Sequence, residues 1–260
     1  MTKLEDYAHK YENIHIERRN GVLEMRLHSN GDSLKWCEPI HRDLGYAFHD
    51  VACDVENKVV LLTGTGDDFC ADLETLPPLP TPRTWDKIYW EGKRVLMNLM
   101  DIEVPVISAI NGPARIHVEF PLVADIVLAS ETAVFQDAPH FPTGTIPGDG
   151  VNIIFPLLMG ETRGKYFLLT GQELSASEAQ DLGLVNEVLP KDKLTERAWE
   201  LAEQLAQKPP LTLRYTRVVL NFRLKRLLQE MLGYGLALEG IGALDLGAEL
   251  SSKFESLKQE

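Results

Sequence analysis

The sequence predicts an α/β fold, because three observations on its 260 residues agree. Apolar or alternating segments of strand length take turns with segments whose apolar residues recur every three or four positions. Residues 59–62 are apolar without interruption, which is typical of a strand buried on both faces of a parallel sheet. The last quarter of the chain has helical periodicity throughout. We therefore expect a layered parallel core followed by helices.

The first elements are predicted to be a hairpin and a helix. Residues 14–16 and 22–27 alternate, and Asn20-Gly21 between them favours a two-residue hairpin turn. A helix is expected at about 37–52, followed by the buried strand at 58–63.

Four prolines within 72–83 exclude a regular element there, so that we expect a loop that acts as a mobile lid. A helix at 85–101 and strands at 105–110 and 125–129 follow.

The chain is predicted to end in helices. Ser175 and Glu178 form a capping box that opens a short helix, and a strand follows at 185–189. Two helices are expected at about 195–207 and 211–244, the second broken around Gly233 or Gly235 because glycine weakens a helix interior.

Charge and composition exclude several kinds of partner. The chain has 26 basic and 39 acidic residues, a formal net charge of −13, which opposes binding to nucleic acid. No apolar run approaches the roughly 18 residues that span a bilayer, and the charged N-terminus does not resemble a secretion signal. Cys37, Cys53 and Cys70 show no pairing pattern and are expected to be reduced thiols. We expect a cytoplasmic protein without nucleic-acid or membrane partners.

Residues 171–188 resemble the crotonase (enoyl-CoA hydratase/isomerase) superfamily, whose members carry the pattern TGxxxxAxEAxxxGLVNxV in this segment. Residues 105–112, 124–129 and 145–148 agree with that resemblance in order and spacing. It implies a spiral core of ββα turns, here 1–200, and a C-terminal helical region for trimerisation, here 201–260. The implied assembly is a homotrimer or a dimer of trimers.

The chain departs from the crotonase pattern where members of that superfamily bind a thioester. The family holds the thioester oxygen with backbone amides in glycine-rich turns, but Asp72 stands at one expected glycine and the other turn carries His117. His140 replaces the second catalytic glutamate of hydratases, whereas Glu119 aligns with the first. Side chains fill the space that glycines leave open, so that the thioester pocket is predicted to be remodelled.

These departures resemble the β-diketone hydrolase branch of the superfamily, which cleaves a C–C bond of a cyclic 1,3-diketone without CoA or metal. The resemblance implies a retro-Claisen hydrolase that acts on a small-molecule diketone, gives a keto acid and uses no cofactor. The residues it assigns to catalysis are Trp36, His117, His140, Asp149 and Glu239.

The residue types suit that chemistry. An imidazole with a pKa of about 6.5 can take a proton from water, and a carboxylate behind it fixes its tautomer. We expect His140 and Asp149 to form this pair, since the intervening glycines allow a sharp turn. The indole N–H of Trp36 is suited to bind a carbonyl. The resemblance also implies that Glu239 keeps His117 protonated, so that His117 donates to the diketone.

Three alternatives remain open. The first is a CoA-thioester hydratase or isomerase that uses Glu119. The second is a non-catalytic subunit of crotonase fold. The third is a zinc enzyme with His117, Glu119 and His140 as ligands. The remaining histidines are expected to have no catalytic role; they are His9, His15, His28, His41 and His49.

Overall fold

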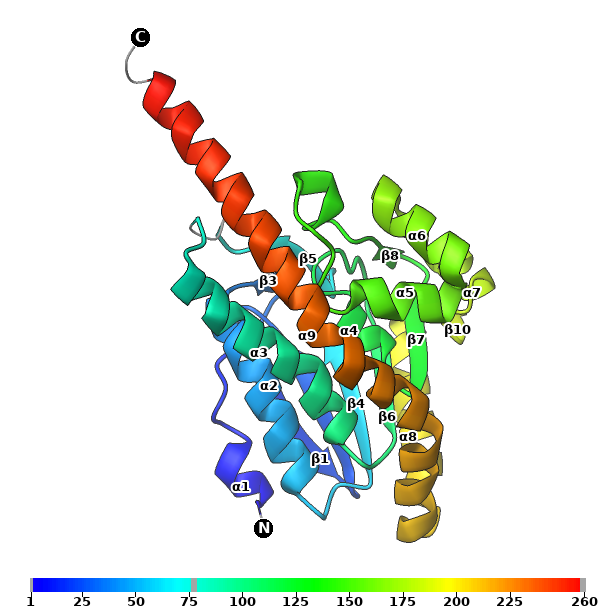
Figure 1. Ribbon diagram of the computed structural model, residues 1–260. Coiled ribbons are helices and arrows are strands. Elements are labelled where there is room, and N and C mark those ends of the chain that lie inside the picture. Colours follow the sequence, from blue (N-terminus) through cyan, green and yellow to red (C-terminus); the bar gives the residue numbers. More distant parts are fainter. Residues whose placement is uncertain (1, 76–78, 258–260) are drawn as a thin grey trace.

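The computed structural model describes residues 2–75 and 79–257 (Figure 1). The elements in chain order are α1 (Leu4–Tyr7), β1 (Ile14–Arg19), β2 (Val22–Leu27), β3 (Leu34–Trp36), α2 (Glu38–Cys53), β4 (Val59–Gly64), β5 (Cys70–Leu73), α3 (Pro82–Asp101), β6 (Val106–Ile110), α4 (Glu119–Leu122), β7 (Ile126–Ser130), β8 (Val134–Phe135), the 3-10 turn η1 (Phe141–Thr143), α5 (Val151–Met159), α6 (Glu161–Thr170), β9 (Leu174–Ser175), α7 (Ala176–Asp181), β10 (Glu187–Leu189), α8 (Lys191–Ala206) and α9 (Pro210–Leu257).

The strands form two layers. The larger sheet has the order β1-β2-β4-β6-β7-β10, with β1 antiparallel to β2 and every other neighbouring pair parallel. In the smaller layer β3 pairs with β5 and β8 pairs with β9. Ala114 joins these two pairs, because it bridges to Cys70 on one side and to Phe135 on the other. The predicted α/β fold class is confirmed.

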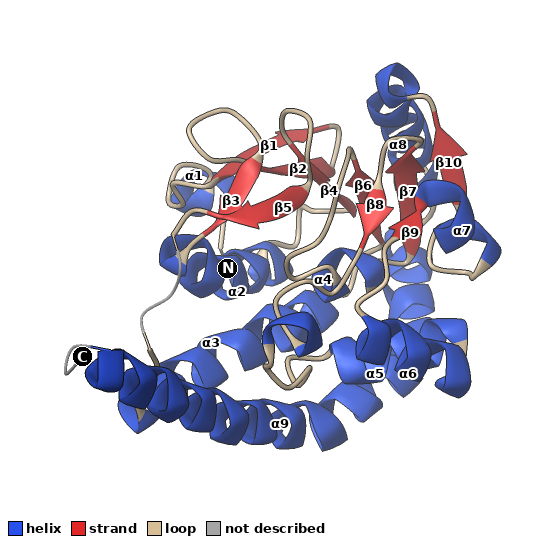
Figure 2. Ribbon diagram, turned by 90° about the horizontal axis from the view of Figure 1, so that it is seen from above, coloured by secondary structure: helices blue, strands red, loops and turns tan. Residues whose placement is uncertain are grey.

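The chain winds as a spiral in which a strand of the large sheet, a strand of the small layer and a helix follow one another. The elements β2, β3 and α2 make one such turn, and β4, β5 and α3 make the next. Helices α2, α3, α5 and α9 lie on one side of both layers (Figure 2). Residues that follow the second strand of each turn therefore come together between the small layer and these helices.

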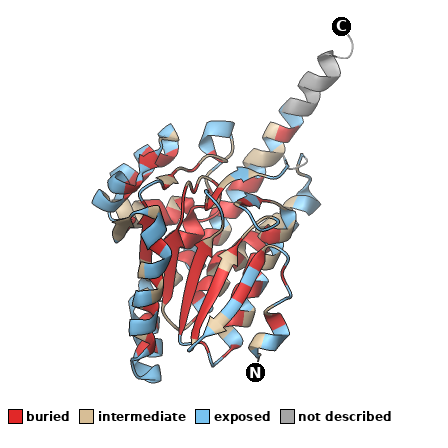
Figure 3. Ribbon diagram, turned by 180° about the vertical axis from the view of Figure 1, so that it is seen from behind, coloured by how far each residue is buried: buried red, intermediate tan, exposed pale blue. Residues whose placement is uncertain are grey.

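The large sheet is buried on both faces, which explains its uninterrupted apolar strand. In β4, Val60 and Leu62 belong to the main core, whereas Val59 and Leu61 pack in a second cluster with Ala198 and other residues of α8. Figure 3 shows the central strands as almost entirely buried. Alternate side chains point to opposite faces, so that both faces need apolar residues.

The expected hairpin is present. The strands β1 and β2 are antiparallel, and Arg19 pairs with Val22 next to the turn. The turn residues Asn20 and Gly21 both have positive φ, 54° and 83°. Two positive φ values match the right-handed twist of the flanking strands.

Two helices begin earlier than the periodicity indicates. Helix α3 starts at Pro82 instead of residue 85, because Thr81 caps it and proline is favoured in a first turn. Helix α8 starts at Lys191 instead of residue 195. The predicted loop is shortened to the segment between β5 and α3, and part of the predicted lid, 76–78, lies outside the described residues.

The predicted break near Gly233 or Gly235 is wrong, because α9 is one helix from Pro210 to Leu257. The glycines of α9 lie where other segments approach it closely. A Cβ atom on Gly235 would lie 2.3 Å from the carbonyl oxygen of Gly148, and one on Gly240 would lie 2.1 Å from the indole nitrogen of Trp85. These glycines are required for tertiary contact rather than for a bend.

Within the described ranges, no helix combines the length and the hydropathy that crossing a bilayer requires.

We predict that Gly235→Ala destabilises the protein by about 1–3 kcal/mol, because backbone atoms on both sides of the contact leave no room for a methyl group. Urea denaturation followed by circular dichroism measures the change. Gly92→Ala in α3 is the matched control. Its Cβ would meet its nearest neighbours at 3.6 Å, an ordinary contact, and alanine should stabilise the helix by up to about 1 kcal/mol. Equal effects of the two changes would contradict this explanation.

We propose that α9 takes part in assembly of the predicted homotrimer or dimer of trimers, because it exposes an unusually apolar surface. The residues concerned are Leu211, Tyr215, Val218, Val219, Leu220, Phe222, Met231, Tyr234, Leu238 and Ile241. Light scattering should show that Val219→Glu combined with Phe222→Glu lowers the molar mass in solution. Val55→Glu, at an equally exposed apolar residue outside α9, should leave it unchanged. A wild-type monomer would contradict the proposal.

Candidate active site

Two neighbouring loops bring the predicted histidines together. The segment after β8 runs beside the segment around Ala114, since Gln136 N–H donates to Ala114 O at 3.2 Å and Ala138 N–H donates to Arg115 O at 3.1 Å. One segment leads directly to His117 and the other to His140. Both histidines thus follow the small layer in successive turns of the spiral.

His117 occupies a backbone conformation that glycine favours. Its φ is 50°, in the left-handed region where non-glycine residues are uncommon. Such a conformation costs of order 1–3 kcal/mol and is found preferentially at functional sites. His117 therefore has a left-handed backbone in the turn where the sequence resemblance leads us to expect glycine.

The ring of His117 binds two carboxylates through the same nitrogen. Its Nδ1 lies 2.9 Å from Glu119 Oε1 and 3.2 Å from Asp149 Oδ2. Burial disfavours the charged ring, but the attraction of Glu119 and the contacts with Asp149 outweigh burial and raise the pKa of His117 to about 10. His117 is therefore an imidazolium at neutral pH.

Trp36, at the end of β3, stacks on His117. The ring centroids are 4.0 Å apart at an interplanar angle of 30°, and Trp36 is buried. A cation over an indole face is attracted by its quadrupole, which adds to the stability of the charged imidazole.

His140 lies between carboxylates on both of its ring nitrogens. Nδ1 is 2.5 Å from Asp137 Oδ1, while Nε2 is 3.5 Å from both Asp149 Oδ2 and Glu239 Oε1. Burial lowers the pKa of His140, but Asp149, Asp137 and Glu239 together raise it well above the ordinary value. The expectation of a base near its ordinary pKa of about 6.5 is corrected accordingly.

The structure also corrects the expected pairing of carboxylates and histidines. Asp137, not Asp149, binds the Nδ1 side of His140, and Asp149 lies between His140 and His117. Glu239 contacts His140 instead of the expected His117. The close approach of α9 to Gly148 explains this position, because it directs Glu239 toward the loop that carries His140.

The four buried carboxylates differ in their affinity for protons. Burial would raise the pKa of Asp149, but the charges of His140 and His117 outweigh it and hold that pKa well below the usual range. Burial raises the pKa of Glu119 to about 7, aided by repulsion from Asp149. Burial also raises the pKa values of Asp137 and Glu239. The cluster can therefore hold and transfer protons near neutral pH.

Two neighbours of the site, His41 and Asp137, were missed by sequence reasoning. His41 was expected to have no catalytic role, but its ring lies 5.9 Å from that of Trp36 and 5.7 Å from that of His117, and Nδ1 is 3.1 Å from the buried Glu91. Burial lowers the pKa of His41, so that its ring is neutral. The sequence signal for Asp137 was its position three residues before His140.

One group of the described residues has the geometry to hold a metal ion. His117, Glu119 and Asp149 offer ligand atoms that all lie within 4.8 Å of one another. This set differs from the predicted zinc set, which contained His140 in place of Asp149. A metal would first have to displace the proton of His117, which the same two carboxylates stabilise.

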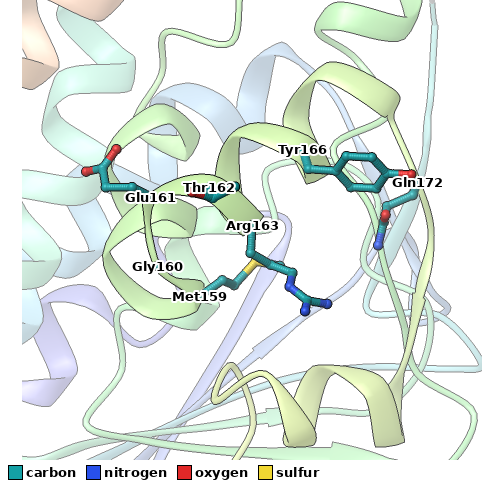
Figure 4. Close-up of a pocket in the computed structure, with 7 residues that line it drawn as sticks. All are labelled: Met159, Gly160, Glu161, Thr162, Arg163, Tyr166 and Gln172. Carbon is teal, nitrogen blue, oxygen red and sulfur yellow. The ribbon is translucent and has the colours of Figure 1, made fainter.

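A surface pocket of about 580 Å³ lies away from this cluster, beside the junction of α5 and α6. Figure 4 shows its lining residues, among them Arg163, Tyr166 and Gln172. None of the five predicted site residues lines it.

Comparison with known proteins identifies the family. The model of the enoyl-CoA hydratase/isomerase family matches residues 17–237. The chain belongs to the enoyl-CoA hydratase/isomerase family. Carnitinyl-CoA dehydratase of Salmonella typhi is 30% identical to this family member over 207 residues, which are 78% of this chain and 77% of the dehydratase.

Solved structures of the enoyl-CoA hydratase/isomerase family agree with this fold. A β-diketone hydrolase from the cyanobacterium Anabaena sp. PCC 7120, bound to (S)-3-oxocyclohexyl acetic acid, is 56% identical with a TM-score of 0.91, covering 93% of this chain and 98% of that one. An enoyl-CoA hydratase/isomerase from Mycobacterium paratuberculosis is 26% identical with a TM-score of 0.83, covering 89% and 94%. The resemblance found in the sequence is confirmed.

We predict that Asp149→Asn lowers the pKa values of both His117 and His140 in this family member, because it removes a negative charge that stabilises both imidazolium ions. Nuclear magnetic resonance titration of ¹⁵N-labelled histidines measures both pKa values. Asp181→Asn, an exposed position on α7, should change neither. If only one histidine responded, Asp149 would not be shared.

Proposed function

We propose that the protein is a hydrolase that cleaves a C–C bond of a cyclic β-diketone and releases a keto acid. The observation that carries this proposal is the pair of histidines that share Asp149, of which His140 is buried and His117 is partly buried. Such a site supplies both a proton acceptor for water and a charged donor for a carbonyl. The β-diketone hydrolase that is 56% identical to this chain supports the same activity.

The ligand of that hydrolase indicates a class of substrate. Joining the carboxyl carbon of (S)-3-oxocyclohexyl acetic acid to the ring carbon that lies beside the ketone and opposite the acetate-bearing carbon, with loss of water, gives a bridged bicyclic octanedione. Both of its carbonyl groups flank one bridgehead carbon, which cannot enolise without twisting the double bond. We propose that this chain acts on diketones of this non-enolisable type.

In the proposed reaction, His140 Nε2 takes a proton from water while the water oxygen bonds to one carbonyl carbon. The bond from that carbon to the bridgehead then breaks, which leaves a carboxylic acid and an enolate on the remaining ketone. Diketone and water together contain all the atoms of the keto acid, so that no oxidant or cofactor enters the balance.

The His117 side of the site suits the developing enolate. Both carboxylates contact His117 through Nδ1, which leaves Nε2 to donate to the ketone oxygen, with the indole N–H of Trp36 as a second donor. A preorganised donor of this kind is worth about 3–4 kcal/mol in a transition state. Asp149 lies within 3.5 Å of His140 and 3.2 Å of His117, and we propose that it passes the proton to the enolate carbon.

A CoA-thioester hydratase or isomerase is the second candidate. The pKa of Glu119, raised to about 7, suits a general acid or base, and the carnitinyl-CoA dehydratase similarity is consistent with it. Against it, the sequence resemblance places His140 where the second catalytic glutamate of hydratases is expected. The three unpaired cysteines fit the cytoplasmic location that we propose in either case.

Incubation with bicyclic 1,3-diketones should give products heavier by one water, detected by mass spectrometry, with a rate that EDTA leaves unchanged. His140→Ala should lower kcat by roughly 10³-fold or more, because it removes the proton acceptor. His15→Ala, at an exposed histidine of β1, is the matched control and should retain full activity. Turnover of crotonyl-CoA without diketone hydrolysis would establish the alternative instead.

We predict that kcat/KM rises with pH, with an acid limb at a pH above the ordinary histidine pKa of about 6.5. The neighbouring carboxylates raise the pKa of His140, and a base must be deprotonated to act, so that activity is lost as pH falls through the raised pKa. Rates measured from pH 5 to 10 in buffers of constant ionic strength give the limb. A flat profile would remove His140 from the role of base.

A further inference from the structure

We propose that Asp137 is the positioning residue of the proposed hydrolase: it holds His140 in one tautomer, so that Nε2 faces the reacting side. The inference rests on the proposed function for its kinetic consequence, but its structural part does not depend on any activity. It assigns to Asp137 the part that sequence reasoning gave to Asp149.

The two side chains form a short, buried contact. Asp137 Oδ1 lies 2.5 Å from His140 Nδ1, and the two residues are only 2% and 4% exposed. At this distance Nδ1 carries the shared proton and donates it to the carboxylate. A carboxylate that accepts a hydrogen bond from one imidazole nitrogen determines what the other nitrogen can do.

The backbone keeps both partners in place. Asp137 lies between Gln136 and Ala138, whose N–H groups donate to the neighbouring segment at Ala114 and Arg115. The carbonyl of His140 accepts from Thr143 N–H at 2.9 Å and Thr145 N–H at 3.0 Å. Because the backbone anchors both residues, the imidazole ring of His140 cannot flip without breaking the contact between Nδ1 and Asp137.

The other nitrogen meets a different environment. Nε2 lies 3.5 Å from Asp149 and 3.5 Å from Glu239, distances that are longer than a direct hydrogen bond. Asp149 and Glu239 therefore lie on the Nε2 side of the ring, where a proton can be exchanged, whereas Asp137 lies on the Nδ1 side.

The wild-type protein provides the first test. With histidines labelled by ¹⁵N, the spectrum should contain a strongly downfield Nδ1 proton that exchanges slowly with water, and His140→Gln should remove it. In Asp137→Asn this proton should move upfield and the ¹⁵N shifts of His140 should change. A His140 ring protonated only at Nε2 in the wild type would overturn the inference, whether or not the protein has activity.

Kinetics of Asp137→Asn provide the second test. Loss of the correct tautomer should lower kcat by roughly 10³–10⁴-fold, with KM changed much less, because Asp137 does not face the substrate. The acid limb of kcat/KM should move to lower pH, because the amide no longer stabilises the imidazolium, a shift that a purely structural defect would not produce.

Glu173→Gln is the matched control, because it removes the same charge from an exposed partner of Arg115 on the adjoining segment. It should leave kcat and the acid limb unchanged. If wild type hydrolyses diketones and Asp137→Asn keeps its kcat and its pH profile, the inference is wrong. If wild type hydrolyses none, the proposed function fails, and the spectra still decide the role of Asp137.

Discussion

Burial of charge at one point governs much of this structure. The rings of His117 and His140 lie among four buried carboxylates, and Asp149 touches both rings. An isolated carboxylate in such a place would cost several kcal/mol, and removing either ring would leave that cost uncompensated. The loops that carry these groups are therefore under a strict geometric requirement, which the spiral meets by placing them after successive strands of its small layer.

The long helix α9 completes this arrangement from outside the spiral. Its glycines allow backbone contact with Gly148 and side-chain contact with Trp85, so that Glu239 reaches His140. The same helix exposes the large apolar surface on which we base the proposed assembly. Site geometry and the assembly that we propose thus involve the same element, and a change that shifts α9 should disturb the site.

The family relationship explains the fold better than the chemistry, because sites can change while a fold persists. The chain keeps the fold of its family, and His117 has a left-handed backbone in the turn where the sequence resemblance leads us to expect glycine. Under the proposed function, side-chain donors such as His117 take the part of backbone amides, which suits a substrate without a CoA group.

The sequence alone determined the fold class and the opening hairpin, because periodicity and turn chemistry are local properties of the chain. Its resemblance to the β-diketone hydrolase branch pointed to the five residues that the structure brings into one cluster. The 1–200 and 201–260 division stays a prediction. Only the tertiary structure decided which carboxylate binds which nitrogen. Asp137 and Asp149 are both near His140 in sequence, and their distances to its two nitrogens depend on contacts between separate turns of the spiral. The same reason applies to Gly235, whose local propensity favours a break while its packing against Gly148 requires a continuous helix.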